Sequence, residues 1–79
     1  MMPTLGKWLN AASVTPSDSA ALLSPAGAIS VGVSGTITVD TVGGQKNVEL
    51  TLAAGYIVEI AVTKIYATGT TATGICVFW

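Results

Sequence analysis

The side chains of this sequence that could do chemistry are four carboxylates and one thiol. The carboxylates belong to Asp18, Asp40, Glu49 and Glu59, the thiol belongs to Cys76, and the sequence has no His. Acid–base catalysis needs two groups with separated pKa values around one substrate, and the spacing of these acids does not indicate such a pair. A thiol or a Ser hydroxyl needs a neighbouring base to act as a nucleophile. We therefore expect no enzymatic activity.

The same residue types offer little to a metal or a cofactor. A structural zinc site draws on several Cys and His ligands, and the acids do not follow the alternating order of a calcium-binding loop. The Thr-rich segment 68–73 lacks the Lys and the following helix of a phosphate-binding loop. Cys76 lies in an apolar run and is expected to be a small buried residue. We expect no metal and no cofactor, and we expect the Thr hydroxyls to satisfy backbone groups of their own loop or of a neighbouring subunit.

Charged residues are scarce along the whole chain. Of 79 residues, three are Lys or Arg and four are Asp or Glu, whereas 51% are hydrophobic. A small soluble domain usually has about a quarter of its surface charged. Chains of this size often depend on disulfides, metals or oligomerisation for stability, and a single Cys cannot form an intrachain disulfide. The composition therefore predicts a homo-oligomer whose surface is largely covered by other protein.

This composition also argues against nucleic acid and membrane as partners. Three scattered Lys residues are too few to neutralise a phosphate backbone. The longest apolar stretch, 52–67, is interrupted by Glu59 and Lys64 and is too short to span a bilayer. Residues 1–12 lack the sustained apolar segment of a signal peptide. A lone Cys is compatible with synthesis in a reducing cytoplasm.

The second part of the chain has the pattern of short strands. Runs of β-branched residues, separated by Gly, lie at residues 28–33, 36–39, 47–52, 56–67 and 74–79. The first two runs are expected to form a hairpin, and the long fourth run is expected to be kinked or bulged midway. The predicted fold class is all-β: a small antiparallel β-sandwich or barrel of five to six short strands.

The first part of the chain, residues 1–27, is expected to be an extended N-terminal arm that precedes a β-domain at 28–79. It contains all three Pro residues, which favour extended backbone. Solvated arms seldom carry a Trp and several Leu residues, and Trp is common at interface hot spots. We therefore expect the arm to be anchored on a neighbouring molecule by Trp8, Leu9, Leu22 and Leu23.

The last predicted strand ends in two aromatic residues, Phe78 and Trp79. Aromatic side chains of this size are seldom left in solvent, so both are expected to pack against something. Packing in the core and packing against a partner both remain open for Trp79. We include Phe78 and Trp79 among the candidate interface residues.

Several short motifs follow one another in a recognisable order. They are Val14-Thr15-Pro16-Ser17-Asp18-Ser19, Val31-Gly32, Gly43-Gly44-Gln45, Ala54-Gly55 and Ala-Thr-Gly-Thr-Thr-Ala-Thr at 67–73. This order resembles the head-spike base proteins of gene-transfer-agent particles and of related tailed phages and prophages, over roughly residues 14–77. The segment 67–73 is the most specific part of the resemblance. The sequence departs from the family in its longer, more apolar N-terminus and in having no Arg on its long strand.

The resemblance implies a virion structural protein on the capsid surface, made in the host cytoplasm and lacking enzymatic activity and cofactors. It implies a β-rich pentamer at the fivefold vertices that contacts the major capsid protein and carries a spike or fibre. Alternatives remain open. They are a trimeric cement or decoration protein that clamps capsomers, a tail or connector component, and a soluble carbohydrate-binding module.

Overall fold

Strands are the regular elements of this protein, and the computed structural model describes residues 8–22 and 25–79. Within these two ranges the strands are β1 (Ala11–Ser13), β2 (Ala28–Ser30), β3 (Gly35–Thr41), β4 (Val48–Leu52), β5 (Ile57–Val58), β6 (Val62–Tyr66) and β7 (Cys76–Phe78). The described ranges contain no helix that could cross a membrane.

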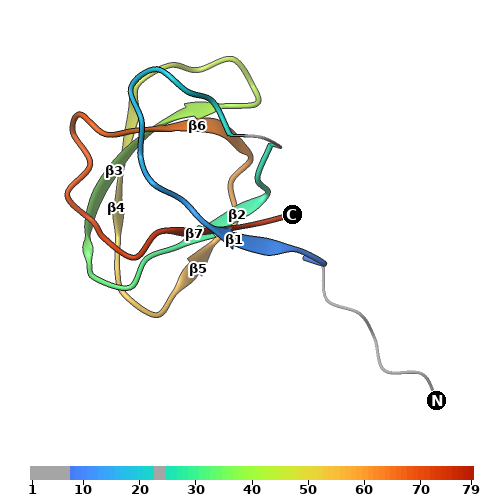
Figure 1. Ribbon diagram of the computed structural model, residues 1–79, viewed down its shortest axis with the longest axis vertical. Helices are drawn as coiled ribbons and strands as arrows, with labels where there is room; N and C mark the ends of the chain where they lie inside the picture. Colours follow the sequence, from blue (N-terminus) through green and yellow to red (C-terminus); the bar gives the residue numbers. More distant parts are fainter. Residues whose placement is uncertain (1–7, 23–24) are drawn as a thin grey trace.

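The strands form two antiparallel sheets (Figure 1). One is a four-stranded sheet in the order β1–β7–β2–β5, and the other is a three-stranded sheet in the order β4–β3–β6. Both hold their neighbours in antiparallel register. The predicted all-β antiparallel fold is confirmed, with seven strands where five to six are expected.

The predicted hairpin of residues 28–33 with 36–39 is wrong. β2 lies in the four-stranded sheet and β3 in the three-stranded sheet, so the chain crosses between the sheets instead of turning back on itself. The crossing passes very close to the segment before β7, because a Cβ at Gly35 would lie 2.6 Å from the backbone nitrogen of Ala72. This close approach of two backbones requires Gly at position 35.

The long apolar run 56–67 also divides between the two sheets. β5 pairs with β2 in the four-stranded sheet, and β6 pairs with β3 in the three-stranded sheet. The irregularity expected midway along this run is therefore a change of sheet across residues 59–61. The change of sheet divides one predicted strand into β5 and β6, and β1 is a further strand within the predicted arm. Together they explain why seven strands are present.

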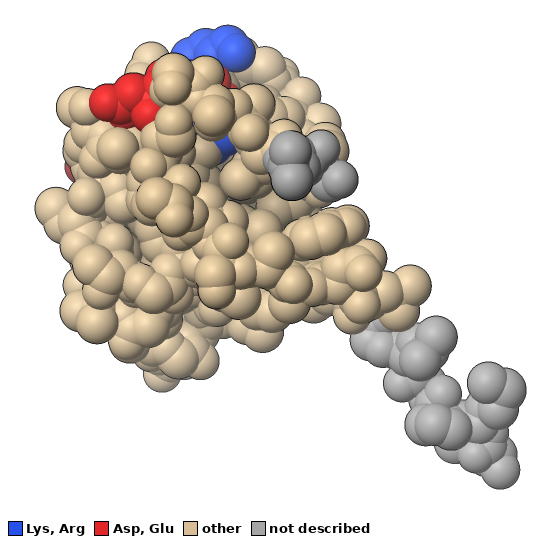
Figure 2. All heavy atoms as spheres, viewed as in Figure 1, with Lys and Arg blue, Asp and Glu red and all other residues tan. Residues whose placement is uncertain are grey.

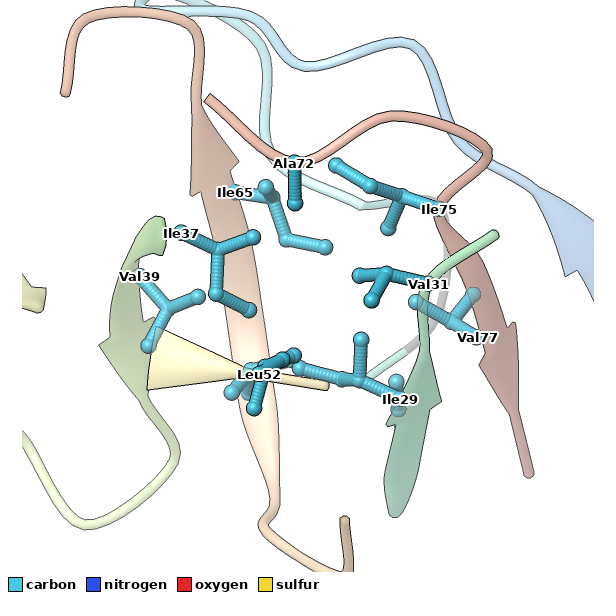
Figure 3. Packing of buried hydrophobic residues seen from close by; sticks show 11 residues of the cluster. Ile29, Val31, Ile37, Val39, Leu52, Ile65, Ala72, Ile75 and Val77 are labelled. Atoms are coloured by element: carbon cyan, nitrogen blue, oxygen red, sulfur yellow. The ribbon is translucent and has the colours of Figure 1, made fainter. Parts of the chain in front are cut away.

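The hydrophobic core lies between the two sheets, and Figure 3 shows side chains from both sheets pointing toward one another. Its largest fully buried side chains are those of Ile29, Ile37, Val39, Val62 and Ile65. Alternation places Ile37 and Val39 on the same side of β3. Val62 and Ile65 are three residues apart on β6, and both point inward because the pairing of β6 with β3 shifts by one residue between Asp40 and Thr41. The three strands β3, β4 and β6 thereby turn one apolar face inward and one polar face outward.

The start of the described chain is bonded to the sandwich. β1 lies within the predicted arm and pairs with β7, and the side chains of Ala12 and Val14 pack against the core. The following segment continues across to the three-stranded sheet, where the Ser17 amide donates to the Ile65 carbonyl at 3.0 Å. Residues 8–22 therefore run along the sandwich from one sheet to the other.

Candidate interaction surface

The four-stranded sheet has an outward face without charged residues. Strand pairing aligns one row of Ala11, Phe78 and Ala28, and a second row of Ser13, Cys76, Ser30 and Ile57. Paired residues share a face of the sheet. The alternate residues Ile29 and Val77 are in the core, so both rows point away from it. No strand residue of this sheet is charged.

The three-stranded sheet has the opposite character. The residues that point away from the core, by the same pairing argument, are Thr36, Thr38, Asp40, Glu49, Thr51, Lys64 and Tyr66. This outward face is polar throughout and carries both signs of charge. A solvent-facing antiparallel sheet normally has this composition. The molecule therefore has one outward face suited to water and one that is not.

An apolar groove of about 430 Å³ lies beside β1. Two of the predicted interface residues, Leu22 and Trp79, line it together with Ala12, Val14 and Val77. Leu22 is half-buried against the core, whereas Trp79 is 38% exposed. The groove therefore joins the predicted arm to the end of β7.

The other predicted interface residues lie around the same end of the sheet. The Leu9 amide donates to the Trp79 carbonyl at 2.9 Å, but the Leu9 side chain is 69% exposed. The Trp8 indole lies against the backbone of Gly27, where a Cβ would come within 2.6 Å of its Cζ3 atom. Phe78 is half-buried on the outward face. Leu23 belongs to the same predicted set and lies outside the described residues.

The two most distant motifs of the sequence, at 14–19 and 67–73, are in contact. Asp18 accepts a hydrogen bond from the Thr68 amide at 2.8 Å and one from the Thr68 hydroxyl at 2.6 Å. Lys64 donates to the Asp18 carbonyl oxygen at 2.6 Å. The hydrogen bonds from the Thr68 hydroxyl and amide hold the pKa of Asp18 below its usual value. Asp18 therefore ties residues 17–20 to the loop before β7.

The Thr-rich loop uses its hydroxyls within the chain. The Thr71 hydroxyl accepts from the Thr36 amide at 2.9 Å, and the Thr70 hydroxyl accepts from the Thr38 amide at 3.1 Å. The loop is thereby fastened along β3. The expectation that these hydroxyls satisfy backbone groups of their own loop or of a neighbouring subunit is wrong for Thr70 and Thr71, because both accept from amides of β3 in the same chain.

Asp40 is the buried carboxylate of the described chain, and its contacts are structural. The Tyr66 hydroxyl donates to both of its oxygens, at 2.8 and 2.9 Å, and the Asn47 amide donates at 3.1 Å. Burial raises the pKa of Asp40, but these hydrogen bonds and the nearby Lys46 outweigh burial, and the pKa lies below its usual value. The hydrogen bond to Asp40 raises the pKa of Tyr66. Within residues 8–22 and 25–79, no cluster of three or more acids, Cys or His could hold a metal ion.

The Asp18 contact predicts a pH-dependent stability. Because the folded-state pKa lies below that of the unfolded chain, ionised Asp18 stabilises the fold above about pH 4, and this contribution is lost as the pH falls through the folded-state pKa. Asp18→Asn should therefore lower the unfolding midpoint by a few degrees at pH 7. Thermal unfolding should show a smaller difference at pH 3, and Thr68→Val should behave similarly at pH 7. An equal difference at both pH values would refute this role of the carboxylate.

Neither a protein-family model nor a curated protein matches the chain. A solved structure that resembles it is a chain in the capsid of a native GTA (gene-transfer-agent) particle, computed with C5 symmetry. The two chains are 32% identical, the match covers 91% of this chain and 83% of that one, and the TM-score is 0.81. This chain belongs to the family of that GTA capsid protein. The sequence-based resemblance to gene-transfer-agent particles is thereby confirmed. For a member of the GTA capsid family, the uncharged outward face and the apolar groove are the candidate contact surfaces.

Proposed function

We propose that this chain is a virion structural protein of the capsid exterior, acting as the head-spike base at the fivefold vertices. The likeness to the GTA capsid chain, 32% identical over 91% of this chain, carries the proposal. The narrower role is supported by the motifs at 14–19 and 67–73, which resemble those of head-spike base proteins. These two motifs form one unit through the hydrogen bonds between Asp18 and Thr68.

The edges of the four-stranded sheet support a cyclic homo-oligomer, with a pentamer favoured at a fivefold vertex. β1 and β5 lie at opposite edges, and the three antiparallel pairings between them make them run in opposite directions. Rotation about an axis parallel to the strands therefore places β1 of one copy antiparallel to β5 of the next, as a closed ring allows. Neither strand contains a charge or a Pro, the usual devices that prevent edge pairing.

Large exposed apolar side chains lie near both edges. Leu9, two residues before β1, is 69% exposed, and Tyr56 and Ile57 at β5 are 70% and 54% exposed. Apolar and aromatic side chains of this kind are enriched at the centres of protein interfaces. Ring formation would place these side chains beside the neighbouring copy.

The ring predicts a specific effect of charge at β5. The wild-type protein should have a native mass of about 40 kDa, five times 7.9 kDa. Ile57→Lys should shift the protein toward monomers, because a lysine on an edge strand disfavours pairing of that edge with another strand. Val42→Lys, at a loop position that is 53% exposed, is the matched control and should leave the mass unchanged. A ring that survives Ile57→Lys would contradict the junction, and a trimer would contradict the pentamer.

The proposed partners are the major capsid protein and a spike or fibre. We assign the contacts with neighbouring molecules to the described residues Trp8, Leu9, Leu22, Phe78 and Trp79, together with Leu23. Four of these surround the groove or the end of the four-stranded sheet next to it. The groove offers an apolar site into which a segment of a partner could pack.

Counting copies on purified particles tests the vertex position. Quantitative mass spectrometry, with the major capsid protein as internal standard, should give about 60 copies per particle, which is five at each vertex. Several hundred copies would indicate a cement protein that clamps capsomers. Roughly six or twelve copies would indicate a tail or connector component, given the symmetry of such assemblies. Either result would contradict the proposed role.

A further inference from the structure

The two outward faces of the sandwich differ in charge: the outward face of the three-stranded sheet carries charged residues, and that of the four-stranded sheet does not. On the three-stranded sheet, Glu49 of β4 and Lys64 of β6 place accessible charges on the outward face, and Asp40 of β3 points the same way but is buried. The seven outward residues of the four-stranded sheet include none. In the view of Figure 2, the coloured charged atoms gather mainly at the end of the molecule where β6 lies, and the surface around β1, β5 and β7 is free of them.

We propose that the outward face of the four-stranded sheet is the surface that lies against the capsid shell, with the three-stranded sheet turned toward solvent. This orientation rests on the proposed function. The outward rows contain small or apolar residues, and Ala11, Ser13 and Ile57 among them are exposed. Ala28, in the same face, is fully buried, so the accessible part of the face lies at the two edge strands, β1 and β5.

Charge defines the chemistry of the partner surface. A charged group buried opposite these rows would find no counter-charge in them, and an unpaired buried charge is strongly destabilising. The matching patch of the shell is therefore uncharged and apolar at its centre. Glu59, one residue beyond β5, borders the face and marks where the contact becomes polar.

A second copy of the chain is the other occupant of this face that the experiment below distinguishes. Two copies stacked face to face would form a closed twofold pair. The ring proposed above uses the edges of the sheet, where backbone groups are available, and leaves the face unoccupied. Side chains of a sheet stand roughly perpendicular to it, so edge pairing at β1 keeps the Ser13 side chain accessible.

Thiol labelling measures the orientation directly. In a Cys76→Ser background, Ser13→Cys places a thiol on the four-stranded face, and Glu49→Cys places one on the three-stranded face; both positions are exposed. Binding to particles that lack the protein should slow maleimide labelling of the Ser13→Cys variant by about tenfold or more, because thiol reactivity depends on access. Labelling of the Glu49→Cys variant should stay unchanged.

The outcomes separate this orientation from the proposed function. Equal labelling of both variants on the particle, or slowing of the Glu49→Cys variant alone, would overturn the orientation while leaving capsid binding intact. Slow labelling of the Ser13→Cys variant in the free protein, with a mass of two stacked assemblies, would identify a second copy as the occupant and overturn it as well. Failure of the wild-type protein to bind particles would contradict the proposed function and, with it, this orientation.

Discussion

Ser13→Lys is expected to weaken binding of the protein to particles by about 100-fold or more. Ser13 is exposed on β1, in the row shared with Cys76 and Ser30, and a lysine there would place a charge on the uncharged face. Burying an unpaired charge in a contact costs about 3–5 kcal/mol. Co-sedimentation of the labelled protein with particles would measure the change.

The matched control for this substitution is Thr51→Lys. Thr51 is also exposed and lies on an outward sheet face, but on β4, where Glu49 already carries a charge. This variant should bind as the wild type does. Equal losses from both substitutions would show that the change of net charge matters, not the face, and would contradict the assigned contact surface.

Ile65→Ala is expected to lower the free energy of unfolding by about 2–5 kcal/mol, the usual cost of truncating a fully buried aliphatic side chain. Ile65 lies on β6, is 2% exposed, is paired with Val39 of the neighbouring strand and points into the core between the two sheets (Figure 3). The free energy of unfolding of a domain of this size is small, so much of the variant should be unfolded at moderate temperature. Urea denaturation monitored by Trp fluorescence would measure the loss.

Val42→Ala is the control for the core substitution. Val42 is 53% exposed in the turn after β3, and its truncation should change the free energy of unfolding by about 0.5 kcal/mol or less. A loss at Ile65 no larger than that at Val42 would contradict the position of the core between the two sheets.

Much of the fold could be predicted from local patterns. The alternation of Val48, Leu50 and Leu52 with polar neighbours places β4 and its inward face correctly. The Gly-punctuated runs similarly predict an all-β domain without helices. These features depend on the order of polar and apolar residues close together in the sequence, and this order can be read without the structure.

Strand pairing could not be predicted in the same way. Alternation shows which side of a strand is apolar, but it does not show which sheet the strand joins. β2 and β3 follow each other closely and look like a hairpin, yet they lie in different sheets, and the run 56–67 changes sheets without a Gly or Pro at the break. In both cases contacts between distant segments, such as β2 with β7, determine the outcome.

The candidate surface was partly visible in the sequence. Phe78 is a predicted interface residue and lies on the uncharged face, but its row contains Ala11 and Ala28, small residues that carry no signal by themselves. Their alignment depends on the pairing of β1, β7 and β2. One signal was available: the strands of one sheet contain no charge, whereas β3, β4 and β6 contain one each.

Imaging of intact particles by electron cryomicroscopy, with and without this protein, tests the account most directly. We expect added density on the outside of the shell at the fivefold vertices, with β1, β7, β2 and β5 against the shell and the charged face of β3, β4 and β6 outward. Particles that look identical at every vertex, or density inside the shell or along the tail, would contradict it.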